Sequence, residues 1–130
     1  MLTKGQLTDK CEKMQRFLEL KPGSEPHDLI DRIELLSVLI SQSGECLADA
    51  KYLQDIAIGE AIQKSINLGY DQKLSISTIN KYVNAEAKEF NWLVNTFDRI
   101  NSASVHQLDG LRSILSYRKT EFATLSYGGK

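Results

Sequence analysis

The chain has only two cysteines, no histidine at ligand spacing from another and no long hydrophobic run. Cys11 and Cys46 lack a CxxC or Cys/His pattern, which argues against a zinc site. No stretch approaches the roughly 18 apolar residues that a membrane span needs. Residues 1–20 are polar and mixed in charge, unlike a signal peptide. We therefore expect a cytoplasmic protein without membrane contact, in which both cysteines serve as small apolar residues.

Sequence motifs for catalysis and phosphate binding are also missing. No GxxxxGK[ST], GxGxxG or GxSxG occurs, and residues 128–130 form a terminal Gly-Gly-Lys rather than a phosphate loop. His27 and His106 lack an HxxxH or HxxE partner. Glu86 and Glu89 lie on one predicted helical face, where solvated charges are the simplest interpretation. These absences predict a protein that is not an enzyme and holds neither a metal nor a cofactor.

Apolar residues instead recur three and four positions apart over most of the chain, which predicts an all-α protein. A length of 130 residues suits a single domain, 1–130. We expect a short helix over 3–20, a long helix over 26–66, a second long helix over 77–122 and a flexible tail over 123–130. The two long helices should form an antiparallel hairpin.

Short segments rich in turn-forming residues separate these helices. Residues 21–26 read Lys-Pro-Gly-Ser-Glu-Pro, which ends the first helix and places Ser24 to cap the second. Residues 67–74 are expected to form the hairpin turn, and Ser75 or Ser77 can cap the return helix.

Small residues are predicted to meet at the middle of the hairpin. If the turn centres near Asp71, residues whose numbers sum to about 142 face each other. Ser41, Ser43 and Gly44 then oppose residues 100–104. We interpret this as a close approach or bend of the helices, and a pocket or hinge is the alternative.

The net charge of -1 is unevenly distributed along the chain. Residues 1–24 carry five basic and three acidic residues, a balance of +2, and 25–60 carry two and eight, a balance of -6. Residues 61–98 are neutral at four and four, and 99–130 carry five and two, a balance of +3. The hairpin should bring opposite charges together, with pairs worth about 0 to 1 kcal/mol each. The acidic side is Asp28, Asp31 and Glu34, and the basic side is Arg112, Arg118 and Lys119.

The basic end of the chain interleaves cations with an aromatic ring. Arg112, Arg118 and Lys119 can hold phosphates while Tyr117 stacks on a base, so these four are candidate residues for binding single-stranded nucleic acid. One such segment would bind weakly, but a ring of identical subunits would gain avidity. The alternative interpretation is a solvated, salt-bridged helix end.

A family resemblance involves the same segment. Residues 110–119, Gly-Leu-Arg-Ser-Ile-Leu-Ser-Tyr-Arg-Lys, follow a long helix with Tyr82, Phe90, Leu93 and Phe97. This stretch resembles the C-terminal helix of small helical proteins from bacteriophage and prophage replication and recombination modules. The order of predicted helices is remotely similar to the recombination mediator of T-even phages. That resemblance implies a ring-forming protein that binds single-stranded DNA and helps to load a recombinase in the cytoplasm of a bacterial host. The present chain lacks an overall basic charge, unlike that family.

Two functional hypotheses remain. The first is a non-enzymatic phage-type accessory protein for single-stranded DNA recombination or replication that acts as a homo-oligomer. The alternative is an inhibitor or adaptor that binds a host or phage protein through the acidic stretch 25–60. Two helices alone leave much apolar surface exposed, so either the short first helix completes a three-helix bundle or other copies do.

Overall fold

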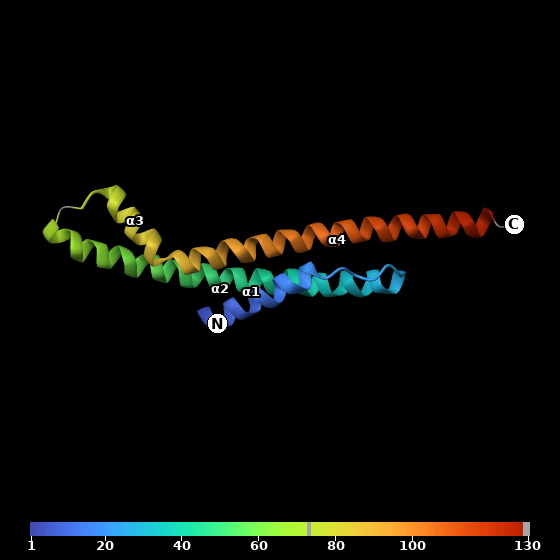
Figure 1. Cartoon of the computed structure of the whole chain (residues 1–130), viewed down its shortest axis with the longest axis horizontal. Helices are drawn as coiled ribbons and strands as arrows, with labels where there is room; N and C mark the ends of the chain where they lie inside the picture. Colours follow the sequence, from blue (N-terminus) through green and yellow to red (C-terminus); the bar gives the residue numbers. More distant parts are fainter. Residues whose placement is uncertain (73, 129–130) are drawn as a thin grey trace.

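The computed structural model describes residues 1–72 and 74–128, without the side chains of residues 69–72, 122 and 125–128. These residues form helices α1 (Lys4–Glu19), α2 (Pro26–Gln72), α3 (Ile76–Glu86) and α4 (Lys88–Gly128). Figure 1 shows α2 and α4 side by side and antiparallel, with α1 lying along the middle of the pair. The predicted all-α class and long helical hairpin are confirmed.

Helix α1 begins and ends as the spacing of its residues predicts. Thr3 Oγ1 accepts from the Gln6 amide at 3.2 Å, and Gln6 Oε1 accepts from the Thr3 amide at 2.9 Å. This reciprocal capping box satisfies two amides that a helix start leaves free. At the other end, the Leu20 amide donates to the Phe17 carbonyl at 3.2 Å.

The core lies where α1 covers one side of the hairpin. Leu7, Cys11 and Met14 of α1 are buried against residues of both long helices. Full burial of a Leu or Phe side chain contributes about 1.5–3 kcal/mol, so this cluster stabilises the three-helix arrangement. The other buried members of the cluster are Leu36, Leu39, Cys46, Ala50, Leu93, Phe97, Ile100 and Leu108.

Helix α2 is longer than predicted. It continues through residues 67–72 to Gln72, so the predicted turn over 67–74 is wrong for those residues. Gly69 costs an α-helix only about 1 kcal/mol, and packing on α3 can offset that cost. Ala61 and Ser65 are buried on the side that α3 contacts. Residue 73 lies outside the described part of the chain, and Ser75 then caps α3 by accepting from the Thr78 amide at 3.2 Å.

The predicted helix over 77–122 is two helices, α3 and α4, joined at Ala87. Ala87 has φ -92° and ψ 4°, outside the helical region, and is fully buried. Figure 1 shows α3 set at an angle to α4. The bend lets α3 pack on the C-terminal part of α2 while α4 packs on the rest of α2 and on α1.

Helix α4 also runs further than predicted at its C-terminal end. Residues 123–128, expected to form a flexible tail, are helical as far as Gly128. The Thr120 hydroxyl donates to the Ser116 carbonyl, and the Thr124 hydroxyl donates to the Thr120 carbonyl. Both hydroxyls therefore find their acceptors one turn earlier in the same helix. Residues 129 and 130 of the predicted tail lie outside the described residues. The C-terminal part of α4 therefore extends beyond the start of α2 (Figure 1).

Candidate functional site

The middle of the hairpin is closed by a polar contact between α2 and α4. Asn101 Nδ2 donates to the Ile40 carbonyl at 3.0 Å and to Ser43 Oγ at 2.9 Å. Ser43 and Ser104 are fully buried. A Cβ on Gly44 would lie 4.0 Å from Asn101 Nδ2, which is an ordinary contact distance. The predicted approach of Ser43 and Gly44 to residues 100–104 is confirmed at Asn101, whereas Ser41 is exposed to solvent.

Arg32 was not singled out by the sequence, yet it joins three helices. Its Nη2 donates to the Phe17 carbonyl at 2.9 Å and to Gln107 Oε1 at 3.1 Å. Gln107 Nε2 in turn donates to the Leu18 carbonyl at 3.1 Å. In the sequence, Arg32 is distinguished only as one of two basic residues in the acidic stretch 25–60. It holds the C-terminal end of α1 on the hairpin.

The four predicted nucleic-acid-binding residues do not share one surface. At about 100° per residue, Arg112 and Lys119 lie within about 20° of each other on α4, whereas Tyr117 lies about 140° from Arg112. Tyr117 is 70% exposed, and Arg112 and Lys119 are exposed. Arg118 is half-buried and donates from Nη1 to the Ser24 carbonyl. The structure thus places Arg112 and Lys119 on one exposed face of α4. Tyr117 and Arg118 lie outside that face.

The start of α2 and the C-terminal part of α4 lie at the same end of the hairpin, which we call its open end. The ion pairs predicted between these two segments are not formed. Neither Arg112 nor Arg118 nor Lys119 lies within 4.0 Å of the carboxylates of Asp28, Asp31 or Glu34, all of which the structure describes. Asp28 Oδ1 instead lies 3.2 Å from His27 Nε2, and Arg118 donates to the Ser24 carbonyl. Charges of opposite sign therefore face solvent near this end of the molecule.

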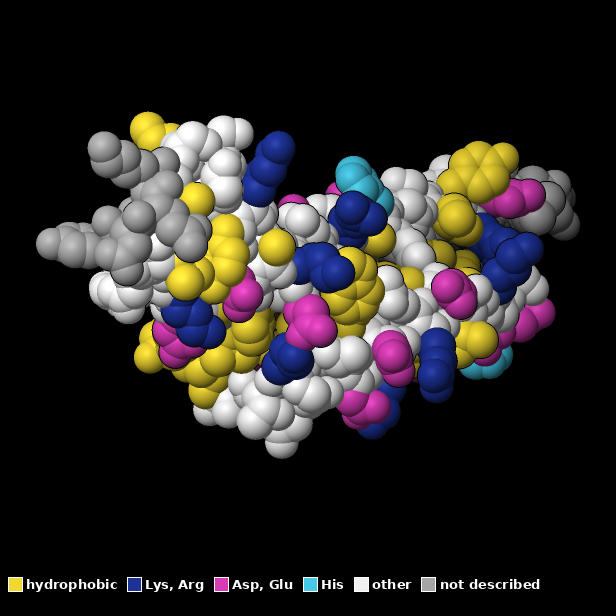
Figure 2. All heavy atoms as spheres, turned by 60° about the vertical axis from the view of Figure 1, so that its left-hand side comes forward, with side chains coloured by type: hydrophobic (Ala, Val, Ile, Leu, Met, Phe, Trp, Pro, Cys, Tyr) yellow, Lys and Arg dark blue, Asp and Glu magenta, His cyan; other side chains and the backbone are white. Residues whose placement is uncertain are grey.

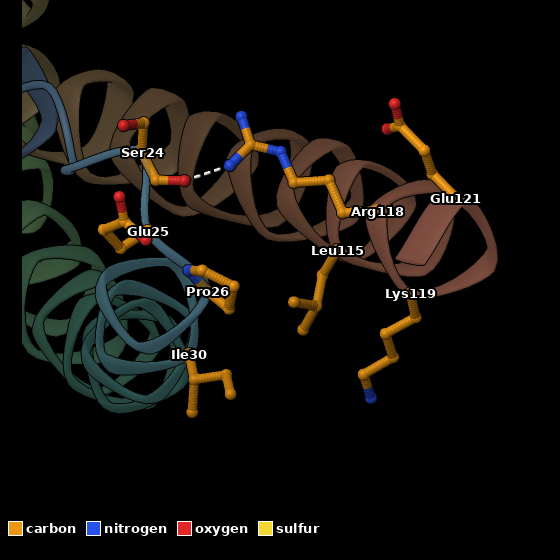
Figure 3. Close-up of a pocket in the computed structure, with 8 residues that line it drawn as sticks. All are labelled: Ser24, Glu25, Pro26, Ile30, Leu115, Arg118, Lys119 and Glu121. Atoms are coloured by element: carbon orange, nitrogen blue, oxygen red, sulfur yellow. Dashed lines mark hydrogen bonds between the residues drawn. The ribbon is translucent and has the colours of Figure 1, made fainter. Parts of the chain in front are cut away.

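A groove lies at the same open end, between the start of α2 and the C-terminal part of α4. It has a volume of about 620 Å³. Figure 3 shows Ile30 and Leu115 directed toward the same space, with Arg118 reaching back to Ser24. The groove is lined by Ser24, Glu25, Pro26, Ile30, Leu115, Arg118, Lys119 and Glu121.

A second surface is the face of α2 that points away from the core. We call it the outward face of α2; it consists of Glu34, Val38, Glu45, Tyr52 and Ile56, which fall within about 40° around the helix axis. Val38, Tyr52 and Ile56 are 54%, 54% and 43% exposed. Both glutamates are exposed as well. The buried residues of α2, such as Leu36 and Ser43, lie about 180° away.

Apolar side chains also reach the surface where α2 meets α3. Figure 2 shows hydrophobic side chains there, interleaved with acidic and basic ones. The exposed apolar residues of this end include Ile62, Ile66, Leu68 and Ile76. Exposure is thus spread along α2 rather than confined to one turn.

Neither cysteine side chain is accessible to solvent or to a reagent. Cys11 and Cys46 are free thiols within the core. Burial, with smaller effects of Glu12 and Cys46, raises the pKa of Cys11 to about 11. Burial likewise raises the pKa of Cys46. Since the thiolate is the reactive form, both thiols are inert near neutral pH.

Within residues 1–72 and 74–128, no cluster of three or more His, Cys, Asp or Glu residues could hold a metal ion. No helix in that part combines the length and apolar content of a membrane span. The chain matches no protein-family model, no curated protein and no solved structure. The resemblance to phage recombination proteins therefore stays a prediction.

Proposed function

We propose that this chain is a non-enzymatic protein-binding module, an adaptor or inhibitor, whose contact surface is the outward face of α2. The observation that carries the proposal is the exposure of Val38, Tyr52 and Ile56 on one side of a helix whose opposite side fills the core. Apolar side chains that gather on an otherwise polar surface mark sites of protein contact. Tyrosine at the centre of such a surface is a frequent source of binding energy.

The charges on this face specify the kind of partner. Glu34 and Glu45 lie among the apolar residues, and the stretch 25–60 carries a balance of -6 from eight acidic and two basic residues. Complementary charges speed association and exclude wrong partners more than they raise affinity. The preferred partner therefore presents an apolar surface bordered by Lys or Arg.

Binding of single-stranded nucleic acid is the second candidate, as part of an accessory role in recombination or replication. It is favoured by the shared exposed face of Arg112 and Lys119. Two cations give a weak contact, with a salt slope of about -1.4 for a single strand. Tyr117, on another side of α4, cannot stack on a base held by those cations. The geometry therefore supports this function less well than protein binding.

Capture of a partner tests the leading proposal. The tagged chain is incubated with nuclease-treated lysate of the source organism, next to the variant Val38→Ser/Tyr52→Ser. The matched control, Ser102→Ala/His106→Ala, changes two exposed residues on α4. We expect one stoichiometric protein to be retained by the wild type and the control and lost from the α2 variant. Retention by all three, or capture by none, would contradict the proposal.

A titration with a labelled single-stranded oligonucleotide at about 50 and 200 mM salt tests the second candidate. Binding at the lower salt that is lost in Arg112→Glu/Lys119→Glu would support it. Absence of binding at the lower salt would remove it. Ser102→Ala/His106→Ala again serves as the control.

A further inference from the structure

We infer that a second copy of this chain packs antiparallel on the C-terminal part of α2, with the Gly59 residues of the two copies meeting at a two-fold axis. The inference rests on the proposed function, because Tyr52 and Ile56 belong to the outward face of α2, and it names the partner of that part of the face. It is supported by a row of exposed apolar side chains, by the symmetry of that row and by the polar groups that the symmetry brings together.

Four large apolar residues are exposed around Gly59 on the side of α2 that points away from α3. Ala61, which is buried on the side that α3 contacts, lies about 160° around the helix axis from Gly59. In Figure 1 this part of α2 extends beyond the N-terminal end of α1. The four residues are 43% or 54% exposed, and we call them, with Gly59 at their centre, the distal stripe: Tyr52, Ile56, Ile62 and Ile66.

The distal stripe is symmetric about Gly59. Its four apolar residues precede and follow Gly59 by three and by seven positions. At about 100° per residue, all four lie within about 60° of the direction of Gly59. When a second α2 runs antiparallel about an axis at Gly59, Tyr52 meets Ile66 of the partner subunit, and Ile56 meets Ile62 of the partner subunit. One surface is thus complementary to its own copy, as a two-fold interface requires.

Gly59 allows the two helices to approach closely at the axis. A Cβ added to Gly59 would meet no atom within 4 Å, so packing inside one chain does not require glycine there. Glycine in a helix interior is nevertheless less favourable than alanine. In the pair, the missing side chain lets the helix axes come to about 8 Å, the lower end of the range for packed helices.

The same axis brings together polar groups that suit each other. Asp55 and Gln63, both exposed, lie four positions before and after Gly59 and about 40° from its direction. The Asp55 carboxylate therefore faces the Gln63 amide of the partner subunit, which can donate to it. Lys51 and Asn67, eight positions from Gly59, oppose each other in the same way. A parallel pair would place Asp55 beside Asp55 and Lys51 beside Lys51, so charge favours the antiparallel arrangement.

The area of this contact suits a weak dimer. Taking roughly 200 Å² for a fully exposed residue of this size, the distal stripe exposes roughly 400 Å² of apolar residues per chain. With the polar residues beside it, the pair buries about 1,000 Å² in total, the lower limit of a specific interface. Glu60 and Lys64 lie about 100° and 140° from Gly59, outside the contact. The distal stripe is therefore covered at high concentration of the chain and free at low concentration.

Self-association of the purified chain tests the inference. Sedimentation velocity and native mass spectrometry from about 1 to 300 µM compare the wild type with Ile62→Ser and Ile30→Ser. Ile30 is 43% exposed, as Ile62 is, but lies outside the distal stripe. We expect the wild type to form dimers, Ile62→Ser to associate at least tenfold more weakly and Ile30→Ser to match the wild type. Circular dichroism confirms that each variant is helical.

A cysteine at the axis tests the geometry of the pair. Gly59→Cys places two thiols side by side, so mild oxidation with copper phenanthroline in air should give a disulfide-linked dimer. Lys64→Cys, at an exposed position on another side of α2, is the matched control and should stay monomeric. The wild type should also stay monomeric under oxidation, because both of its thiols are buried.

A wild type that stays monomeric at every concentration overturns the inference. Equal association of Ile62→Ser and Ile30→Ser, or equal cross-linking of the two cysteine variants, does the same. Ile62→Ser keeps Val38 and Tyr52 and should still capture the protein partner from lysate. Because self-association needs only the purified chain, this inference and the proposed function can fail separately.

Discussion

The guanidinium of Arg32 lies 4.0 Å from the centroid of the Phe17 ring and donates to the carbonyl of the same residue. Arg32 is only 6% exposed and its Nε has no partner. Burial lowers its pKa. The carbonyls at the C-terminal end of α1 carry partial negative charge, which compensates the buried cation. One side chain of α2 thus holds the C-terminal end of α1 against the hairpin.

Replacing Arg32 by alanine should lower the free energy of unfolding by about 2–3 kcal/mol. The change removes two hydrogen bonds from a charged donor and the contact with the Phe17 ring. Urea denaturation monitored by circular dichroism measures the effect. Lys13→Ala, at an exposed position of α1, is the control and should change stability by less than about 0.5 kcal/mol. A loss at Arg32 no larger than the control would show that the contact is not stabilising.

Asn101→Ala should destabilise the hairpin by about 1–3 kcal/mol, because the buried Ser43 hydroxyl and the Ile40 carbonyl both lose a donor. Thermal unfolding of this variant can be compared with that of Asn95→Ala, at an exposed position about one and two-thirds turns earlier in α4. Equal melting temperatures would argue that Asn101 is dispensable at mid-hairpin.

Gly44→Ala should stabilise the protein, by up to about 1 kcal/mol, because alanine is a better helix former than glycine. The added Cβ would lie at an ordinary distance from Asn101. Gly59→Ala, where nothing lies within 4 Å of the new Cβ, gives the reference gain from helix propensity alone. If Gly44→Ala destabilises while Gly59→Ala stabilises, the two long helices approach more closely than described.

Stability should fall with increasing pH between 9.0 and about 11, the range over which an unfolded Cys11 ionises and the folded one does not. The raised pKa favours the protonated thiol in the folded state, so below 9.0 both states are neutral and no dependence arises from this group. Urea midpoints measured across this range test the effect. Cys11→Ala/Cys46→Ala corrects for the other groups that titrate there. A wild type that follows the variant at every pH would contradict the buried positions of the thiols.

The sequence predicted the helices better than it predicted their ends. Spacing of three and four identified α1 and the hairpin because the stripe of buried residues is long and regular. No proline or glycine lies near Ala87, so the sequence does not predict the bend there. The bend depends on the contacts that α3 and α4 make with α2. The turn-forming residues around Gly69 predict an earlier end for α2, because a local signal takes no account of the packing of α3 on this helix.

The sequence also predicts which residues of the candidate site are near each other in the chain, but not which of them share a surface. Arg112, Tyr117, Arg118 and Lys119 are close in sequence, but helical rotation and the bond to Ser24 separate them. The exposed faces of α2 could be recognised only once it was known which side α1 and α4 cover. A groove between two helix ends depends on their register, and a spacing pattern does not fix that register to within a turn.

Site-specific photo-crosslinking can show whether the chain binds protein through the outward face of α2. A photoreactive amino acid placed at Tyr52 is compared with the same group at His106, both exposed positions. We expect covalent products from position 52 after irradiation in nuclease-treated lysate, and none from position 106. Equal products from both positions, or none from position 52, would contradict it.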